Sequence, residues 1–249
     1  MNPKKMLLLL GVIVLIWMQT MGSRSKLNPE VAPGGNFDLT AWTLQLSEGT
    51  GGERAVSAAE LAGAHGYTDE RFYTNSMDGA MILVVPQPEG ASAPASGRTE
   101  FSEVTDGWAA YGTHSLEAEL QVPQLAGPVA VAGIWQAWPQ TGPLCEVVYA
   151  PDGSLQLRIW RTPEGTGTDS VEIGKAVAGQ HFLLTLLLSD DGITANIDGH
   201  NTYADVPAVY TGHHFYFRTG ALVPPAAADT AANPRGTMVK FYRFSLKHE

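Results

Sequence analysis

The sequence predicts an all-β domain, an antiparallel β-sandwich or barrel, from three observations. Apolar and polar residues alternate with a period of two along short segments, of which residues 114–122 are the cleanest. Turn signals such as Asp191-Gly192 and Asp198-Gly199 separate these segments. Helical periodicity is missing from all long stretches, and residues 55–64 are the single short helix candidate. Many short strands at this spacing are typical of sandwiches and barrels.

The strands follow in order along one domain, residues 36–249. Alternation predicts a strand at 98–103, after a loop at 87–97 that is rich in Pro, Ala, Gly and Ser. Further strands are expected at 114–122, 153–161, 182–188, 193–197, 213–220 and 238–246. A second biased loop covers 223–236, and residues 23–35 are expected to form a linker.

The pattern of residues at the N-terminus predicts an export signal. Two lysines precede an apolar run from Met6 to Met18, which is interrupted only by Gly11. Thirteen residues span about 20 Å as a helix, less than the roughly 30 Å of a bilayer core. We therefore expect residues 1–22 to be a signal peptide or an uncleaved N-terminal membrane anchor, and the protein to be exported: periplasmic, membrane-anchored or secreted.

Composition excludes several classes of function. The chain has 15 Lys and Arg against 25 Asp and Glu, so it does not bind nucleic acid non-specifically. Cys145 is the single cysteine and excludes an internal disulfide. No metal-ligand or phosphate-loop motif is present, so we expect no metal and no cofactor. We expect contact with the membrane only through the N-terminal segment, and we expect a monomer.

The polar face of one strand is the first candidate site. In the segment 98–103, Arg98, Glu100 and Ser102 point to one side, while Thr99, Phe101 and Glu103 point to the other. A row of polar groups on a strand suggests the floor of a binding groove. The alternative is an ordinary ion pair on an exposed sheet.

Four segments in order resemble the alginate lyases of polysaccharide lyase family seven. The opening strand is Asn36–Leu46, and the next strand pair runs from Phe72 to Pro86. Arg98–Phe101 is similar to the Arg-x-Glu-Leu-Arg motif, and Tyr216–Gly220 is similar to the Tyr-Phe-Lys-Ala-Gly motif. The order and spacing fit across nearly all of residues 36–249.

The resemblance implies a concave jelly roll and β-elimination on a uronate-containing, alginate-like polysaccharide. In the family, an Arg and a Gln bind the C5 carboxylate, a Tyr acts as acid and often as base, and a His assists. The physical basis is charge stabilisation with positioned proton transfer. By this resemblance Arg98 is a catalytic carboxylate ligand, and Glu100 holds that arginine in place.

The family's Gln-Ile-His tripeptide falls on Gln136-Ala137-Trp138, with Gly142-Pro143 supporting the register. By this alignment Gln136 is catalytic, and Trp138 stands at the His position, where it binds sugar by stacking. Alternatively, Trp138 simply fills the space, or a slipped register puts Trp135 in the site.

Other motif positions depart from the family. The acid/base Tyr becomes Leu222, and the second motif Arg becomes Ser102. Arg218 keeps a positive charge and is a candidate substrate-binding residue, or else a solvated strand residue. Arg158 and Trp160 share a face and form either a sugar platform or a plain half-exposed strand.

Two main hypotheses follow. The first is an exported polysaccharide lyase with non-standard acid/base residues. The second is a non-catalytic polysaccharide-binding protein on a lyase scaffold. An envelope protein with a vestigial groove is a weaker third. In the first two the partner is an acidic polysaccharide.

Overall fold

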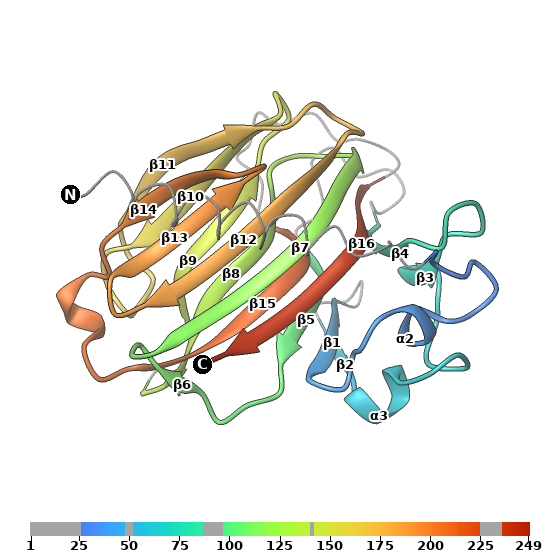
Figure 1. The fold of residues 1–249 in the computed structure, drawn as a ribbon, viewed down its shortest axis with the longest axis horizontal. Coiled ribbons are helices and arrows are strands. Elements are labelled where there is room, and N and C mark those ends of the chain that lie inside the picture. The colour runs from blue at the N-terminus through green and yellow to red at the C-terminus, as the bar shows by residue number, and fades with distance from the viewer. Residues whose placement is uncertain (1–25, 48–51, 87–96, 140–141, 225–235) are drawn as a thin grey trace, which may run out of the picture.

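The protein is a sandwich of two antiparallel sheets, which confirms the predicted fold class. The computed structural model describes residues 26–47, 52–86, 97–139, 142–224 and 236–249. Figure 1 shows the two sheets as stacked layers, with the two short helices α2 (Pro33–Asn36) and α3 (Ala58–Leu61) at one end. A 3-10 turn, η1 (Ala208–Tyr210), precedes β15 (His214–Val223).

The larger sheet contains nine strands within the described residues. Their order is β11 (Thr168–Lys175), β10 (Ser154–Trp160), β9 (Gly142–Tyr149), β8 (Val129–Trp138), β15 (His214–Val223), β5 (Gly97–Glu103), β1 (Trp42–Ser47) and β2 (Glu53–Val56), with β6 (Trp108–Ala109) paired to β15. The two strands that carry the Arg98 and Tyr216 motifs, β5 and β15, are therefore neighbours in its middle.

The smaller sheet covers one face of the larger sheet. Its seven described strands are β14 (His200–Ala204), β13 (Gly192–Ile197), β12 (His181–Ser189), β7 (Thr113–Gln124), β16 (Thr237–His248), β4 (Met81–Val85) and β3 (Phe72–Thr74), in that order. Figure 1 shows it in front, with β16 reaching the C-terminus. All strand ranges predicted between residues 98 and 246 correspond to observed strands within a few residues.

The core lies between the sheets and follows the period of two. On β5, Phe101 points inward against Trp42, Phe72 and Phe244, with ring centroids 5.6–6.1 Å apart. Its neighbours Glu100 and Ser102 point to the opposite face. The inward rings thus fix which side chains β5 presents outward.

The predicted turn signals lie at the two hairpins: Asp190-Asp191 joins β12 to β13, which begins at Gly192, and Asp198-Gly199 joins β13 to β14. Asp198 and Gly199 both have positive φ, 50° and 90°, which is the requirement of a tight two-residue hairpin turn. Aspartate and glycine are the residues that tolerate this backbone best.

Three expectations near the N-terminus differ from the structure. The opening strand begins only at Trp42, because a helical turn ends at Asn36 and a hydrogen-bonded turn between Asp38 and Thr40 follows it. Of the helix candidate 55–64, only Ala58–Leu61 is helical, and a Ser57–Glu60 capping box starts it. The described part of the expected linker lies against the domain, where Ala32 N donates to Ala64 O at 2.9 Å.

No helix among the described residues is long and apolar enough to cross a bilayer. The expected signal or anchor, residues 1–22, lies outside the described residues, as do most of the loops at 87–97 and 223–236.

Candidate active site

A charged cluster occupies the outer face of the larger sheet, the face away from the core. Glu100 on β5 is at its centre, and its side chain is only 5% exposed. Its Oε2 lies 3.5 Å from Arg218 Nη1 and 3.9 Å from Arg98 Nη1. Three of the five predicted site residues, Arg98, Glu100 and Arg218, are therefore brought together.

Each guanidinium in this cluster has further partners. Arg98 Nη2 forms an ion pair with Glu53 of β2. Arg218 Nε and Nη2 donate to the Tyr216 hydroxyl at 3.1 and 2.8 Å. The Arg218 guanidinium also lies 4.0 Å above the ring of Trp135, a close cation–π contact. The arginines are thereby fixed in place before any ligand arrives.

The predicted place of Gln136 in this cluster is wrong. Its side chain is completely buried on the core side of β8. Its amide donates to Pro163 O at 3.0 Å and to Gly142 O at 3.3 Å, and its Oε1 lies 2.7 Å from His213 Nδ1. Gln136 therefore connects β8 to the start of β9, to the loop at Pro163 and to His213 just before β15, and it is not available to a substrate.

Trp138 is also outside the cluster. It is 62% exposed at the end of β8, where its ring meets His214 edge-on at 6.2 Å. Because Ile134 is buried in the core, Gly133 and Trp135 are the β8 residues that face Arg218. Shifting the Gln-Ile-His tripeptide by three residues, onto 133–135, puts its apolar residue in the core. The slipped register, with Trp135 in the site, is the one the structure supports.

The same face continues across β8 to β9 and β10. Arg218 pairs with Gly133, Gly133 with Glu146, and Glu146 with Arg158. Neighbouring strands lie about 4.8 Å apart, so these residues form one row across the sheet. The apolar run around Glu146 gave no sequence signal for a site residue, and only the strand pairing places it in this row.

Glycine is required at position 133, in the middle of the row, because neighbouring atoms lie too close for a side chain. A Cβ there would lie 2.9 Å from Cys145 O, 3.2 Å from Trp135 Nε1 and 3.3 Å from Glu146 Cγ. The missing side chain leaves room for the indole of Trp135 beside Glu146. The Trp135 Nε1 is buried and has no hydrogen-bond partner among the described residues.

Both carboxyl groups of the row hold protons more tightly than usual. Burial raises the pKa of Glu100 to about 7, although Arg218 and Arg98 lower it. Burial and the charge of Glu100 raise the pKa of Glu146 to about 7, against the effect of Arg158 and Arg218. The face therefore carries two acids that titrate near neutral pH and three permanent cations.

A pocket of about 720 Å³ lies elsewhere, at one end of the sandwich. Tyr111, Tyr210, His213 and the aspartates 190, 191 and 205 contribute to its lining. It shares no residue with the charged row. We therefore place the candidate active site on the outer face of the larger sheet.

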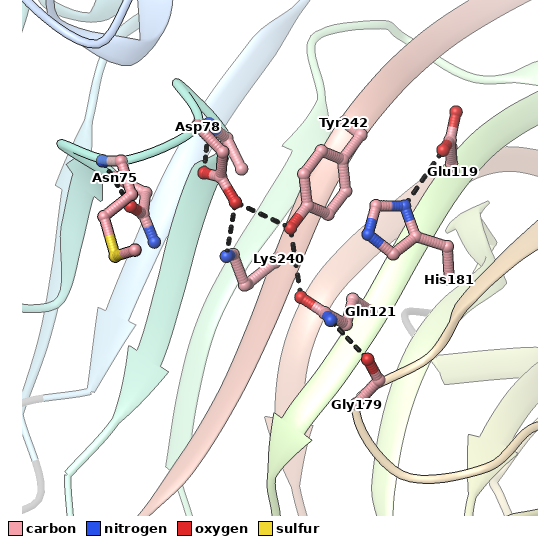
Figure 2. Close-up of polar contacts among 10 residues, drawn as sticks. Asn75, Asp78, Glu119, Gln121, Gly179, His181, Lys240 and Tyr242 are labelled. Atoms are coloured by element: carbon pink, nitrogen blue, oxygen red, sulfur yellow. Dashed lines mark hydrogen bonds and ion pairs between the residues drawn. The ribbon is translucent and has the colours of Figure 1, made fainter.

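A second polar cluster lies on the outer face of the smaller sheet (Figure 2). Asp78 Oδ2 accepts from Lys240 Nζ at 2.8 Å and lies 2.9 Å from the Tyr242 hydroxyl. His181 stacks on Tyr242 at 4.0 Å, and its Nδ1 is 3.1 Å from Glu119 Oε1. These groups tie β16 to the loop before β4 and to β12, which is a structural role.

Asp78→Asn is expected to lower the free energy of unfolding by about 1 kcal/mol at pH 7, the upper range for a partly exposed ion pair. Burial raises the pKa of Asp78, but hydrogen bonds from Lys240, Ala80 N and Tyr242 outweigh it and lower the pKa overall. The stabilisation by the ionised Asp78 carboxylate is thus present above about pH 4, and it is lost as the pH falls through the lowered pKa of Asp78. Urea unfolding at pH 7 and pH 3 tests this, with Asp190→Asn in an exposed turn as control. An equal effect at both pH values would contradict it.

The fold and the charged row define a class: a β-jelly roll with a cationic polar face on its larger sheet. A family model described as alginate lyase matches residues 37–248. The chain therefore belongs to this alginate lyase family.

Solved structures of the same class match over nearly the whole chain. Alginate lyase A1-II′, a member of polysaccharide lyase family seven, has 28% sequence identity and a TM-score of 0.73, covering 88% of this chain and 99% of that chain. A variant of that enzyme in complex with the substrate GGMG has 28% identity and a TM-score of 0.73, with coverages of 89% and 98%. An alginate lyase from Pseudomonas aeruginosa has 19% identity and a TM-score of 0.70, with coverages of 86% and 100%. Among proteins of curated function, no significant sequence match was found.

Proposed function

We propose that this protein is an exported polysaccharide lyase that cleaves an alginate-like polyuronate by β-elimination with non-standard acid/base residues. The observation that carries the proposal is the cluster of Arg98, Glu100 and Arg218 on the outer face of the larger sheet. Membership of the alginate lyase family supports the reaction class. The N-terminal sequence pattern supports export.

β-Elimination on a uronate requires cations at the reacting sugar, and the outer face of the larger sheet provides them as arginines. Elimination starts when the C5 proton of a uronate leaves, and negative charge then develops on the C5 carboxylate. Guanidinium groups stabilise that charge and bind carboxylates with two parallel hydrogen bonds. In a chain with a formal net charge of −10, a local set of arginines is what allows an acidic polymer to bind.

The proton-transfer groups of the family motifs are replaced in this chain. Trp135 faces the site at the corrected His position, and Leu222, opposite Arg98, stands at the Tyr position. Neither side chain exchanges a proton. An active enzyme must therefore use another group on this face.

The alternative is a non-catalytic polysaccharide-binding protein on the same scaffold. The contact between Trp135 and Arg218 favours it, because the indole occupies space at the centre of the face. Aromatic and guanidinium groups are sufficient to bind an acidic sugar without cleaving it.

Ultraviolet absorbance separates the two functions. The purified protein is incubated with alginate, polymannuronate, polyguluronate or glucuronan, and β-elimination creates a conjugated double bond that absorbs. A rise in absorbance with time establishes a lyase. A flat trace with binding to any of these polymers establishes the alternative.

Arg98→Ala is expected to reduce kcat/KM, or affinity if the protein only binds, by about 10-fold or more through loss of a charge-assisted contact. Arg161→Ala serves as control, because Arg161 is an exposed arginine paired with Asp169 away from the row. Equal behaviour of the two variants would refute a role for Arg98 in substrate binding.

A further inference from the structure

Two ionisable side chains in the charged row have no partner among the described residues. Glu146 on β9 and Arg158 on β10 lie directly opposite each other and point to the outer face. Within the described part of the chain, neither forms a hydrogen bond or an ion pair through its side chain. Their charges influence each other without direct contact.

The other charged groups of the face are already engaged. Arg98 is bound to Glu53 and lies near Glu100, and Arg218 is bound to Tyr216 and lies near Glu100. A ligand carboxylate that took either guanidinium would compete with these contacts. Arg158 is the guanidinium that offers its donors without such competition.

The position of Glu146 suits contact with the same sugar ring. Directly opposite residues on antiparallel strands have Cβ atoms about 5 Å apart, so Glu146 and Arg158 reach groups on one ring. Glu146 is only 7% exposed, and the indole N–H of Trp135, unpartnered among the described residues, lies on its β8 side. A buried acceptor and an unpartnered donor next to an open guanidinium are expected of a ligand site.

We propose that Arg158 binds the C5 carboxylate of the uronate and that Glu146 is the base that removes the C5 proton. This assignment rests on the proposed lyase function. The Glu146 carboxylate takes the proton from C5, the electron pair forms the C4–C5 double bond, and the C4–O4 bond breaks. The resulting carboxyl then gives its proton to the departing O4, which leaves as a hydroxyl and restores the ionised glutamate.

The acidity of Glu146 agrees with this role. Burial and Glu100 raise its pKa to about 7, and a base is most effective when its pKa is near the working pH. Because the ionised form is the active one, kcat should rise with pH through about 7. One strand, β8, separates β9 of this pair from β15, so the catalytic groups would have moved across the sheet from the family's motif positions.

The test compares Glu146→Gln, Glu146→Asp and Arg158→Gln with the control Glu117→Gln on the outer face of the smaller sheet. Glu146→Gln should lower kcat by about 100-fold or more and abolish the rise of kcat with pH. Glu146→Asp should keep a pH-dependent fraction of the activity. Arg158→Gln should raise KM and lower kcat, and Glu117→Gln should match the unmodified protein.

The outcomes separate the two proposals. No product from the unmodified protein with any polyuronate would refute the lyase function and this assignment together. An active protein whose Glu146→Gln variant keeps kcat and its pH profile would refute this assignment alone. Circular dichroism of each variant shows whether a loss of activity comes from unfolding.

Discussion

Arg218→Gln is expected to lower the free energy of unfolding by about 3 kcal/mol at pH 8 and by much less at pH 5. The substitution removes the nearest cation from Glu100, whose side chain is only 5% exposed, and leaves Arg98 at 3.9 Å. Removing one partner of a buried ion pair costs about 3–5 kcal/mol because the remaining charge stays buried. The lower value applies here, since one arginine remains.

The pH dependence follows from the raised pKa of Glu100, about 7, which burial causes. At pH 8 the unmodified protein holds Glu100 ionised and needs the guanidinium. At pH 5 Glu100 is already protonated, and the loss of Arg218 matters less. Urea unfolding at both pH values measures the difference.

A double-mutant cycle provides the control for Arg218. Glu100→Gln removes the buried charge, so Arg218→Gln made in that background should cost much less at pH 8. Equal costs in both backgrounds would contradict the ion-pair explanation. They would assign the effect to lost packing of Arg218 on Trp135 instead.

The sequence was sufficient for most of the fold, because the dominant signal, alternation, is local. Residues 114–122 form the central part of β7, and the turn signal Asp191-Gly192 lies at the hairpin between β12 and β13. The prediction was wrong at residues 36–41, where a helical turn ends at Asn36 and the Asp38 side chain accepts hydrogen bonds from the backbone N–H and the hydroxyl of Thr40. Such a local turn between a side chain and the backbone competes with strand formation.

The site was predictable on β5 and β15, because these two strands pair with each other without a register shift and so keep the parity of Arg98, Glu100 and Arg218. It was not predictable on β8, whose pairing with β9 shifts register between Ile134 and Trp135. Glycine at 133 and alanines at 132 and 137 give no clear alternation there. Only the buried Ile134 shows which residues face outward.

Glu146 could not be predicted as a site residue for a different reason. A single glutamate in an apolar strand is read as the one solvated position of that strand. Its significance depends on Gly133 and Arg158, which are distant in sequence and meet it only through strand pairing.

Glu146→Gln is expected to raise the free energy of unfolding by about 2 kcal/mol at pH 8 and by much less at pH 5. Burial and the charge of Glu100 raise the folded-state pKa of Glu146 from 4.5 to about 7. An acid with a raised pKa gives the folded state an advantage at low pH, and that advantage is lost as the pH rises to about 7. One pKa unit corresponds to about 1.4 kcal/mol. The uncharged amide of glutamine does not ionise, so the Glu146→Gln variant avoids most of the stability loss that the unmodified protein shows at high pH.

Thermal and urea unfolding of Glu146→Gln and of the control Glu117→Gln, at pH 5 and pH 8, measure this effect. A destabilised Glu146→Gln at pH 8 would show instead that the ionised carboxylate is held by contacts within the protein. A stabilised variant that has also lost activity would show that the chain keeps an unpaired carboxylate at a cost in stability. Such a cost is expected where a residue serves the reaction rather than the fold. The stability measurement, combined with the activity of the same variant, therefore distinguishes a functional Glu146 from a structural one.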